Sequence, residues 1–528
     1  MKKITSIPFT EIDSIPLLIK DFLKQEIPGF ENTVFTLENS AKQFDLKRNS
    51  FTSGQRTILT ESIQNQYSGF DLKENQRKNL GLLSEENTFT VTTGHQLNLF
   101  SGPVFFIYKI LQTIKTAKFL NQQFPENNVV PIFWLASEDH DFEEINHFKT
   151  ETEFYEISAK SGGAVGRIKV EDDDFISHFE AEFKNAPFGE ELISLVKKTY
   201  QKGNTLSEAT KVLVQELFSD YGLLVLDGDD PALKAQMKAI FKEELLEQQL
   251  FKTTGETVQD LSDQYGKVQV NPREINLFYL SKTRNRIEFR QGLYRIVDTD
   301  ISFSQKEILE ELENHPEKFS PNALLRPVYQ ENILPNLAYI GGNAEIMYWL
   351  ELKNYFRAIH VPFPLLIPRV SLLYLKEKTF VKIEKAALKI SDFFGDFEAL
   401  KNQEILEDHP VIALLEEQEN RLSTQFEELI QAAASTEKTF GNLVDAEKTR
   451  QLKSFGKMRK RLLRAEKIKQ NEKLNRLDNI YLKVHPGKKW QERTLNFSVF
   501  YSDFGAEWLQ NCYEEISVDR SELIIVSI

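Results

Sequence analysis

A strand–helix–strand pattern in the first third of the chain constrains its fold more than any other feature. Residues 88–93 form a short β-branched and aromatic run, which predicts a strand. Pro103 stands where a helix can begin, and apolar residues then recur at helical spacing to about Leu120. Residues 129–136 predict a second, buried strand. Two strands joined by a helix within about 50 residues make a βαβ unit, which predicts a parallel sheet.

The α/β alternation returns in later parts of the chain. A buried strand is expected over 222–227, and Asp229-Asp230-Pro231 then supplies an N-cap and a proline start for a helix. Further elements of this kind are a helix at 324–332, a strand at 337–340, a helix at 343–359 and a strand at 364–368. The prediction is an α/β protein whose core occupies 1–149, 216–250 and 323–371, with connecting insertions at 150–215 and 251–322.

Residues 372–482 have a different character. Glycine is scarce, charge is dense, and Leu415, Leu422 and Leu429 are seven residues apart, which predicts long paired helices of a coiled-coil hairpin. The first arm is acidic and the second is basic, so the arms should pair antiparallel. A mixed pattern of helices and strands resumes at 483–528, and the last strand there should return to complete the core sheet.

Composition excludes several classes of protein. The 528 residues include 40 Phe, 16 Tyr and 4 Trp, which is too much core material for a disordered chain. The only cysteine is Cys512, which excludes a disulfide scaffold and favours a reducing cytoplasm. No apolar stretch is long enough to span a membrane. The net charge of −14 argues against a nucleic-acid partner.

A first candidate site follows the strand at 88–93. Gly94 would let a ligand approach the backbone, and His95 could donate or accept a proton there. Amide groups around Gly102 and Pro103 could hold a phosphate or a carboxylate at the helix start. A turn glycine and a capping histidine account for these residues equally well.

A second candidate site follows the strand at 129–136. The residues from Ser137 to His147 are rich in acidic and imidazole side chains, including Glu138, Asp139, His140 and Asp141. Such a cluster could orient a general base or hold an amine. A helix N-terminus explains the acidic residues, because the macrodipole favours them, but not the histidines. No cysteines accompany the histidines, so we expect no structural zinc and no bound metal.

A third candidate site is the turn at residues 340–345. Gly341 and Gly342 follow a predicted strand, and Asn343 could cap the next helix, with Glu345 in its first turn. Turn chemistry alone would explain this pattern as well.

Five segments resemble the signatures of one family, the BshC proteins, which are assigned as cysteine ligases of bacillithiol biosynthesis. The segments are Thr92–Lys109, Pro131–His147, Leu325–Gln330, Tyr339–Glu345 and Gln491–Arg493. The resemblance covers the chain from its N-terminal region to its C-terminus. It implies a Rossmann-like core broken by two connecting insertions, similar to class I aminoacyl-tRNA synthetases, and a coiled coil that forms a homodimer.

The resemblance also implies a reaction and a site. Family members are assigned the last step, in which cysteine is joined to glucosaminyl malate through an amide bond. ATP would activate the carboxylate by analogy with the synthetases. The expected catalytic residues are His95, Asp139, His140 and Asp141. The expected substrate-binding residues are Gly94, Gln96, Ser101, Gly102, Lys109, Glu138, Asn146, Gly342, Asn343 and Glu345.

Two other classes of function stay open at this point. One is a different nucleotidyltransferase-like carboxylate–amine ligase on the same core. The other is a scaffold or RNA-interacting protein, in which the basic helix at 457–469 does the work and the α/β core is inert.

Overall fold

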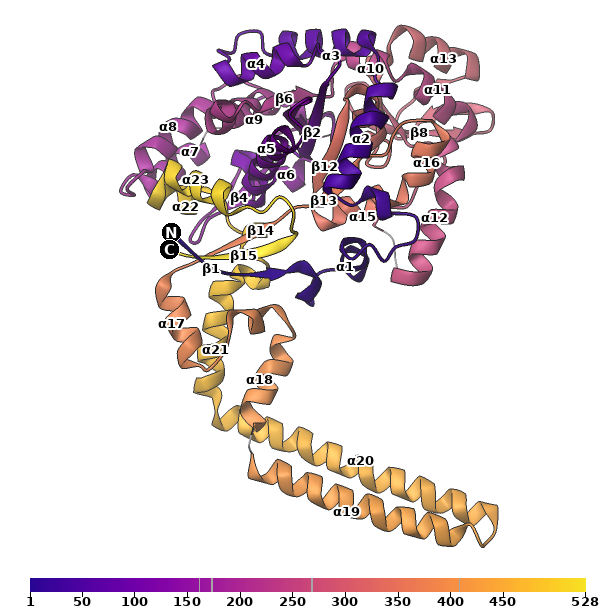
Figure 1. Ribbon diagram of the computed structural model, residues 1–528, viewed down its shortest axis with the longest axis vertical. Coiled ribbons are helices and arrows are strands. Elements are labelled where there is room, and N and C mark those ends of the chain that lie inside the picture. The colour runs from indigo at the N-terminus through magenta and orange to yellow at the C-terminus, as the bar shows by residue number, and fades with distance from the viewer. Residues whose placement is uncertain (161, 172–173, 267–268, 408) are drawn as a thin grey trace. The chain divides into compact units, whose positions relative to one another are not determined.

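The computed structural model describes residues 1–160, 162–171, 174–266, 269–407 and 409–528, and the chain divides into two compact units (Figure 1). The first unit contains Met1–Tyr374 and Lys489–Ile528, and the second contains Leu375–Lys488. The first unit therefore holds the α/β core, and the second holds the long helices.

A five-stranded parallel sheet forms the centre of the first unit. Its order is β13-β12-β2-β3-β6. The strands are β2 (Thr88–His95), β3 (Asn128–Leu135), β6 (Leu224–Asp227), β12 (Asn336–Gly341) and β13 (Leu365–Pro368). In chain order this is 3-2-1-4-5, the Rossmann strand order without its sixth strand, so the parallel sheet predicted from the sequence is confirmed. The strand order reverses between β2 and β12, and in such sheets ligands bind at that switch point.

Helices cover the sheet because their apolar faces share its core. Phe44 of α2 and Ala117 and Leu120 of α5 pack with Phe89 and Ile340 of the sheet in one buried cluster. The helices of the core are α1 (Leu17–Leu23), α2 (Leu37–Ser50), α3 (Ser53–Gln66), α4 (Glu74–Leu82), α5 (Phe105–Gln123), α6 (Phe142–Ile145), α10 (Pro231–Ala235), α14 (Arg326–Ile333), α15 (Asn343–Glu351), α16 (Lys353–Ala358), α22 (Ser498–Phe504) and α23 (Ala506–Glu515). Asp230 caps α10 as expected, since its carboxylate accepts from the N–H groups of Ala232 and Leu233.

Two further groups of elements interrupt the parallel sheet. The first contains the hairpin β4 (His147–Lys149) and β5 (Phe154–Glu156) and the helices α7 (Asp174–Phe183), α8 (Gly189–Thr199) and α9 (Leu206–Phe218). The second contains α11 (Lys238–Glu247), α12 (Gln249–Tyr265), α13 (Gln305–Asn314) and an antiparallel sheet of order β10-β9-β8-β7-β11. The strands of that sheet are β7 (Leu277–Leu280), β8 (Arg284–Arg290), β9 (Leu293–Ile296), β10 (Ser302–Phe303) and β11 (Phe319–Pro321). The two groups meet where the N–H group of Arg284 donates to the carbonyl of Gly162 at 2.8 Å.

The C-terminal strand does not extend the parallel sheet, so that expectation is wrong. β15 (Glu522–Ser527) pairs antiparallel with β1 (Lys2–Pro8), and both belong to a separate sheet of order β1-β15-β14, in which β14 is Ser371–Leu375. The segment predicted as helical from residue 372 therefore begins inside a strand. The two ends of the chain are joined because the backbone groups of each strand satisfy those of the other.

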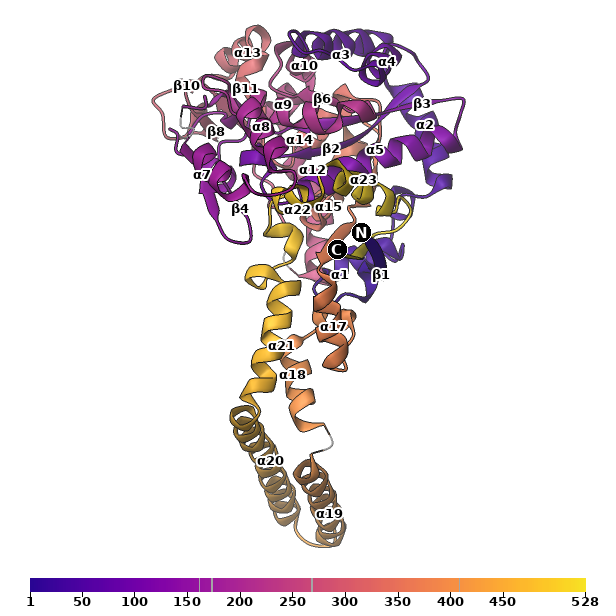
Figure 2. The ribbon, with the colours of Figure 1, turned by 90° about the vertical axis from the view of Figure 1, so that its left-hand side faces the viewer.

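The second unit is a helical hairpin with a helical base. Its helices are α17 (Glu377–Lys385), α18 (Phe397–Leu406), α19 (Pro410–Ala433), α20 (Lys438–Lys469) and α21 (Asn471–Val484). Helices α19 and α20 lie side by side in both views (Figures 1 and 2). Glu419 pairs with Arg459, and Glu427 pairs with Lys448 at 3.1 Å. Going from Glu419 to Glu427 on α19, the partner on α20 moves back from Arg459 to Lys448. The acidic and basic arms are therefore antiparallel, as predicted.

The heptad register differs from the prediction in one place. Leu415 and Leu422 are half-buried, but Leu429 is 51% exposed. Phe426 and Ile430, on either side of it, are half-buried instead. The apolar seam therefore advances by four residues where a strict repeat of seven would have kept Leu429 inside.

Candidate functional site

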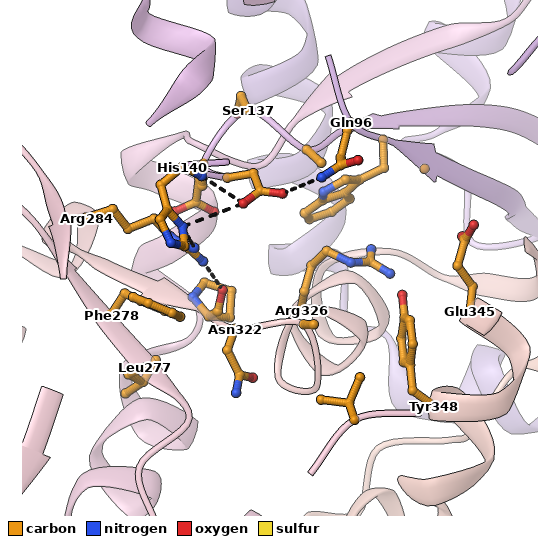
Figure 3. A pocket seen from close by; sticks show the side chains of 18 of the residues that line it. Gln96, Ser137, His140, Leu277, Phe278, Arg284, Asn322, Arg326, Glu345 and Tyr348 are labelled. Carbon is orange, nitrogen blue, oxygen red and sulfur yellow. Dashed lines mark hydrogen bonds and ion pairs between the residues drawn. The ribbon is translucent and has the colours of Figure 1, made fainter. Parts of the chain in front are cut away.

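A cavity of about 690 Å³ opens at the carboxyl ends of β2, β3 and β12 (Figure 3). Its walls come from those strand ends, from helices α14 and α15 and from the second insertion. This volume lies within the range of sites that hold small organic ligands. The cavity also lies at the switch point of the sheet, where its topology predicts a binding site.

The end of β2 brings Gly94, His95 and Gln96 to the cavity, as the sequence predicted. A Cβ atom at Gly94 would lie 3.3 Å from the Cβ atom of Trp134, so close packing of the two strands already favours glycine there. The His95 ring packs against Phe105, with ring centroids 5.1 Å apart. Burial, aided by the nearby charge of Lys109, lowers the pKa of His95 to about 3. His95 is therefore neutral at pH 7 and brings no positive charge to an anion.

A buried ion pair lies behind His95 and joins the two sides of the switch point. The ammonium of Lys109 on α5 donates to the carbonyl of Gly94 at 2.6 Å and to Glu345 on α15 at 2.8 Å. The hydroxyl of Tyr339 donates to the other oxygen of Glu345 at 2.6 Å. Burial alone would raise the pKa of Glu345, but Lys109 and Tyr339 together lower it to about 2. Glu345 lines the cavity, whereas Lys109 is 1% exposed and supports it from behind.

The loop after β3 places Asp139 in the wall of the cavity. One of its carboxylate oxygens accepts from the Gln96 amide at 2.9 Å, and the other accepts from the N–H group of His140 at 2.7 Å. Burial acts to raise the pKa of Asp139, but these hydrogen bonds and the charge of Arg284 lower it overall. Asp139 is therefore an ionised carboxylate whose position is fixed by neighbours from two strand ends.

Glu138 has a different environment from Asp139. It forms a buried ion pair with Lys234 at 2.6 Å, and Lys234 also contacts Asp229 at 3.1 Å. The hydroxyl of Ser137 donates to Asp227 at the end of β6. These contacts anchor the loop after β3 to the neighbouring strand, so Glu138 lines the cavity as part of its support.

His140 faces a residue that the sequence analysis missed. The guanidinium Nη1 of Arg284, from strand β8, lies 2.9 Å from Nδ1 of His140 (Figure 3). Arg284 also lies over the ring of Phe278, at 4.0 Å from its centroid. Burial and the charge of Arg284 lower the pKa of His140. No local pattern marks Arg284, because it belongs to an inserted sheet far along the chain from His140.

The opposite wall carries Arg326 and Tyr348, which the sequence analysis also left out (Figure 3). Arg326 begins α14, donates to Gln330 at 3.1 Å and lies over the ring of Tyr339 at 5.6 Å. Its position inside the segment Leu325–Gln330 was the one signal that pointed to it. The cavity thus has an arginine on each of two facing walls.

The start of α5 does not offer the free amide groups that were expected there. The N–H groups of Ser101, Gly102 and Val104 donate to backbone carbonyl groups at 2.8 to 3.1 Å, and Pro103 has no N–H group. Asn496 also donates to the carbonyl of Gly102 at 2.6 Å. Ser101 and Gly102 therefore belong to a buried loop packed on the C-terminal segment, and neither lines the cavity.

Four more expected site residues lie outside the cavity lining. Asp141 is exposed just before α6, and Asn146, just after it, contacts His147 at 3.0 Å. Gly342 is the N-cap of α15, and Asn343 is the first residue of that helix, so the expectation that Asn343 is the cap is wrong. Gly342 still acts on the site, because its N–H group donates to Glu345 at 3.3 Å.

Two features of the described residues bear on the class of protein. No group of three or more His, Cys, Asp or Glu side chains gathers as it would around a metal ion within those ranges. In the same part of the chain, every helix is too short or too polar to cross a membrane.

Two models of one known protein family together match almost the whole chain. One family model, described as the N-terminal Rossmann-like domain of bacillithiol biosynthesis BshC, matches residues 3–370. A second, the C-terminal coiled-coil domain of BshC, matches residues 372–528. The chain belongs to the BshC family. The Rossmann-like core and the coiled coil that the resemblance implied are therefore both shown.

Individual BshC relatives agree over most of their length. A protein of Flavobacterium johnsoniae named "Putative cysteine ligase BshC" is 42% identical over 93% of each chain. Proteins of the same name from Flavobacterium psychrophilum and Christiangramia forsetii are 41% and 39% identical, over 94% and 99% of this chain and 94% and 98% of their own. This membership favours an enzyme with a working α/β core over an inert scaffold.

Proposed function

We propose that this protein joins the carboxyl group of cysteine to the amine of glucosaminyl malate, as the last step of bacillithiol biosynthesis. The observation that carries the proposal is an ionised carboxylate, Asp139, held in a cavity that is rich in arginine at the switch point of the sheet. An amine attacks a carbonyl carbon only as the free base, so a carboxylate close to it can take up its proton.

The charge of the cavity suits a substrate with more than one carboxylate. Four arginines line it, namely Arg273, Arg284, Arg286 and Arg326. Of the carboxylates that line it, Glu138 and Glu345 are already paired with Lys234 and Lys109. The arginines are therefore left with an excess of positive charge. Guanidinium groups match carboxylates in geometry, and glucosaminyl malate brings two of them.

We also propose that a nucleotide such as ATP activates the cysteine carboxyl group. The cavity is large enough for part of a nucleotide, and Arg326 together with the neutral His95 could contact its phosphates. The Nε2 atom of His95 is buried and has no hydrogen-bond partner in the described structure, which fits a ligand group at that place. Because both the product and cysteine are free thiols, we expect the protein to act in the reducing cytoplasm.

The experiment that tests the function is thiol profiling by mass spectrometry. Cells that lack this gene are compared with the same cells carrying the wild-type copy. Loss of bacillithiol with accumulation of glucosaminyl malate, restored by the wild-type gene, supports the proposal. Normal bacillithiol in the deletion would refute the last-step assignment. Pyrophosphate release that depends on another carboxylate and amine would then point to a different ligase.

We propose in addition that the helical hairpin forms a homodimer. Leu429, Phe440 and Leu443 lie near the turn of the hairpin and are 51%, 48% and 62% exposed. Exposed apolar residues grouped on a charged hairpin are typical of a surface that a second copy covers.

Substituting Leu429 and Leu443 together by glutamate should convert the dimer to a monomer. Two charges would have to be buried at the centre of the interface, which costs several kcal/mol. Light scattering coupled to size-exclusion chromatography measures the mass directly. Leu46→Glu changes a residue that is 54% exposed on α2 of the other unit, and should leave the dimer intact. A double variant that stays dimeric would exclude this part of the hairpin as the interface.

A further inference from the structure

The side chain of Arg284 is fixed in one direction by contacts on three sides. Its Nε donates to the hydroxyl of Ser320 at 3.0 Å, and its Nη2 donates to the carbonyl of Pro321 at 2.8 Å. The ring of Phe278 lies against its face at 4.0 Å. The remaining nitrogen, Nη1, is thereby directed at Nδ1 of His140, 2.9 Å away.

This contact determines which nitrogen of His140 carries the proton. A guanidinium group has only donors, and it stays protonated in proteins. Nδ1 of His140 must therefore be the acceptor, and the neutral ring carries its proton on Nε2. A proton on Nδ1 would set two donors against each other 2.9 Å apart, and in the doubly protonated ring it would also add a second positive charge beside the guanidinium.

The acidic neighbours of His140 do not reverse this assignment. The closest oxygen of Asp139 is 3.6 Å from Nδ1, which is too long for a hydrogen bond. Asp141 precedes α6 on the same loop and acts to raise the pKa of His140, as Asp139 does. Arg284 and Arg286, both on β8, act to lower it, and so does burial, which has the largest effect. Together these effects lower the pKa of His140, which agrees with a neutral ring.

We propose that Arg284 is a positioning residue, which keeps His140 neutral with its proton on Nε2, so that His140 donates a hydrogen bond to the substrate and Asp139 alone accepts the proton. The tautomer follows from the geometry of the site. The role of the donor rests on the proposed amide formation.

The division of roles accounts for the electrons and protons of the addition step. As the amine adds to the carbonyl carbon of cysteine, the C–N bond forms and the π electron pair moves to the carbonyl oxygen. The Nε2–H group of His140 donates a hydrogen bond to that oxygen and keeps its proton. The proton of the adduct's ammonium passes to the carboxylate of Asp139. The C=O bond would then reform as the C–O bond to the activating nucleotide phosphate breaks, and the phosphate would leave with that electron pair. A neutral imidazole can act in this way as an electrophile.

Nuclear magnetic resonance of the full-length protein labelled with ¹⁵N in its histidine rings tests the tautomer without any substrate. His140 is assigned by the signals that vanish in His140→Gln. We expect Nδ1 unprotonated and Nε2 protonated in the wild type at pH 7. In Arg284→Gln the tautomers should mix, and the pKa of His140 should rise, since a nearby cation is removed. Proton on Nδ1 in the wild type, or no change in Arg284→Gln, would overturn the proposal.

Arg286→Gln is the matched control. It removes a neighbouring charge from the same strand but no hydrogen bond to Nδ1, so the tautomer should stay as in the wild type. If Arg284→Gln unfolds, Arg284→Lys provides the same comparison, because lysine keeps the charge but lacks the planar fork. Mixed tautomers in Arg284→Lys would support the directional hydrogen bond from arginine. An unchanged tautomer would overturn the proposal that His140 needs arginine at this position.

Activity separates the role of His140 from the proposed function itself. Glutamine places an amide N–H near the position of Nε2 but cannot take up a proton. His140→Gln should form thiol at least tenfold faster than His140→Ala, and equal rates would overturn the donor role. If the wild-type protein forms no thiol, the proposed function fails, whereas the tautomer measurement still decides whether Arg284 controls His140.

Discussion

Asp139→Ala is expected to reduce bacillithiol formation at least a hundredfold while the protein stays folded. A positioned general base contributes about 10² to 10⁴ in rate, and Asp139 is the ionised carboxylate that Gln96 and the N–H group of His140 direct at the cavity. The measurement is the rate of thiol formation by purified protein given cysteine, glucosaminyl malate and ATP. Thermal unfolding checks that the fold is retained.

Two further variants make this result specific to the carboxylate. Asp139→Asn keeps an oxygen that can accept from the N–H group of His140 but cannot take up a proton, so its rate should be as low as that of alanine. Glu143→Ala removes an exposed carboxylate on α6 that does not line the cavity, and it should act at the wild-type rate. An active Asp139→Ala protein would remove Asp139 from the mechanism.

The sequence identifies one half of this site and misses the other for a physical reason. Strand periodicity and the glycine at 94 locate the carboxyl ends of β2 and β3, and topology then requires these ends to be adjacent. Hence His95, Asp139 and His140 could be predicted. Arg284 comes from an antiparallel sheet inserted between strands, and only the docking of the two insertions brings it to His140.

Other errors have the same origin in tertiary contacts. The glycine at 102 looks like part of an anion-binding loop, but two structural features explain it. Its φ is +61°, and a Cβ atom at this position would lie 2.7 Å from the Cβ atom of Asn98. β15 reads as a core strand, and its apolar pattern does not reveal that its partner is β1. Leu429 continues a repeat of seven that the hairpin does not follow.

Lys109→Met is expected to destabilise the first unit by about 1 to 3 kcal/mol at pH 7, because it leaves the carboxylate of Glu345 without its counter-ion. Lys109 is 1% exposed, but Glu345 is 25% exposed and lines the cavity, so water offsets part of the loss. Urea unfolding followed by fluorescence measures the change. Lys42→Met breaks an exposed pair with Glu38, whose side chains are 52% and 80% exposed, and should leave the free energy of unfolding almost unchanged.

Adding Glu345→Gln to Lys109→Met should recover part of the lost stability. The double variant removes the uncompensated charge and leaves a neutral side chain of similar size that can still accept from Tyr339. If the two side chains act independently, the losses in free energy of unfolding from Lys109→Met and Glu345→Gln should add in the double variant. Such additivity would show that Lys109 and Glu345 do not act as a pair.

The stability of the wild type and that of Lys109→Met should respond in opposite ways when the pH is lowered, because Glu345 has a lowered pKa in one and a raised pKa in the other. In the wild type the folded pKa of Glu345 is about 2, below its ordinary value of 4.5. Its contribution is therefore complete above pH 4.5 and falls as the pH is lowered toward 2. In Lys109→Met the ion pair is gone, and burial should raise the pKa of Glu345 above 4.5. The unfolded carboxylate then holds fewer protons than the folded one, so the variant should regain stability relative to the wild type between pH 7 and pH 5. A stability difference that stays constant over that range would mean that Glu345 is not the group left without its partner.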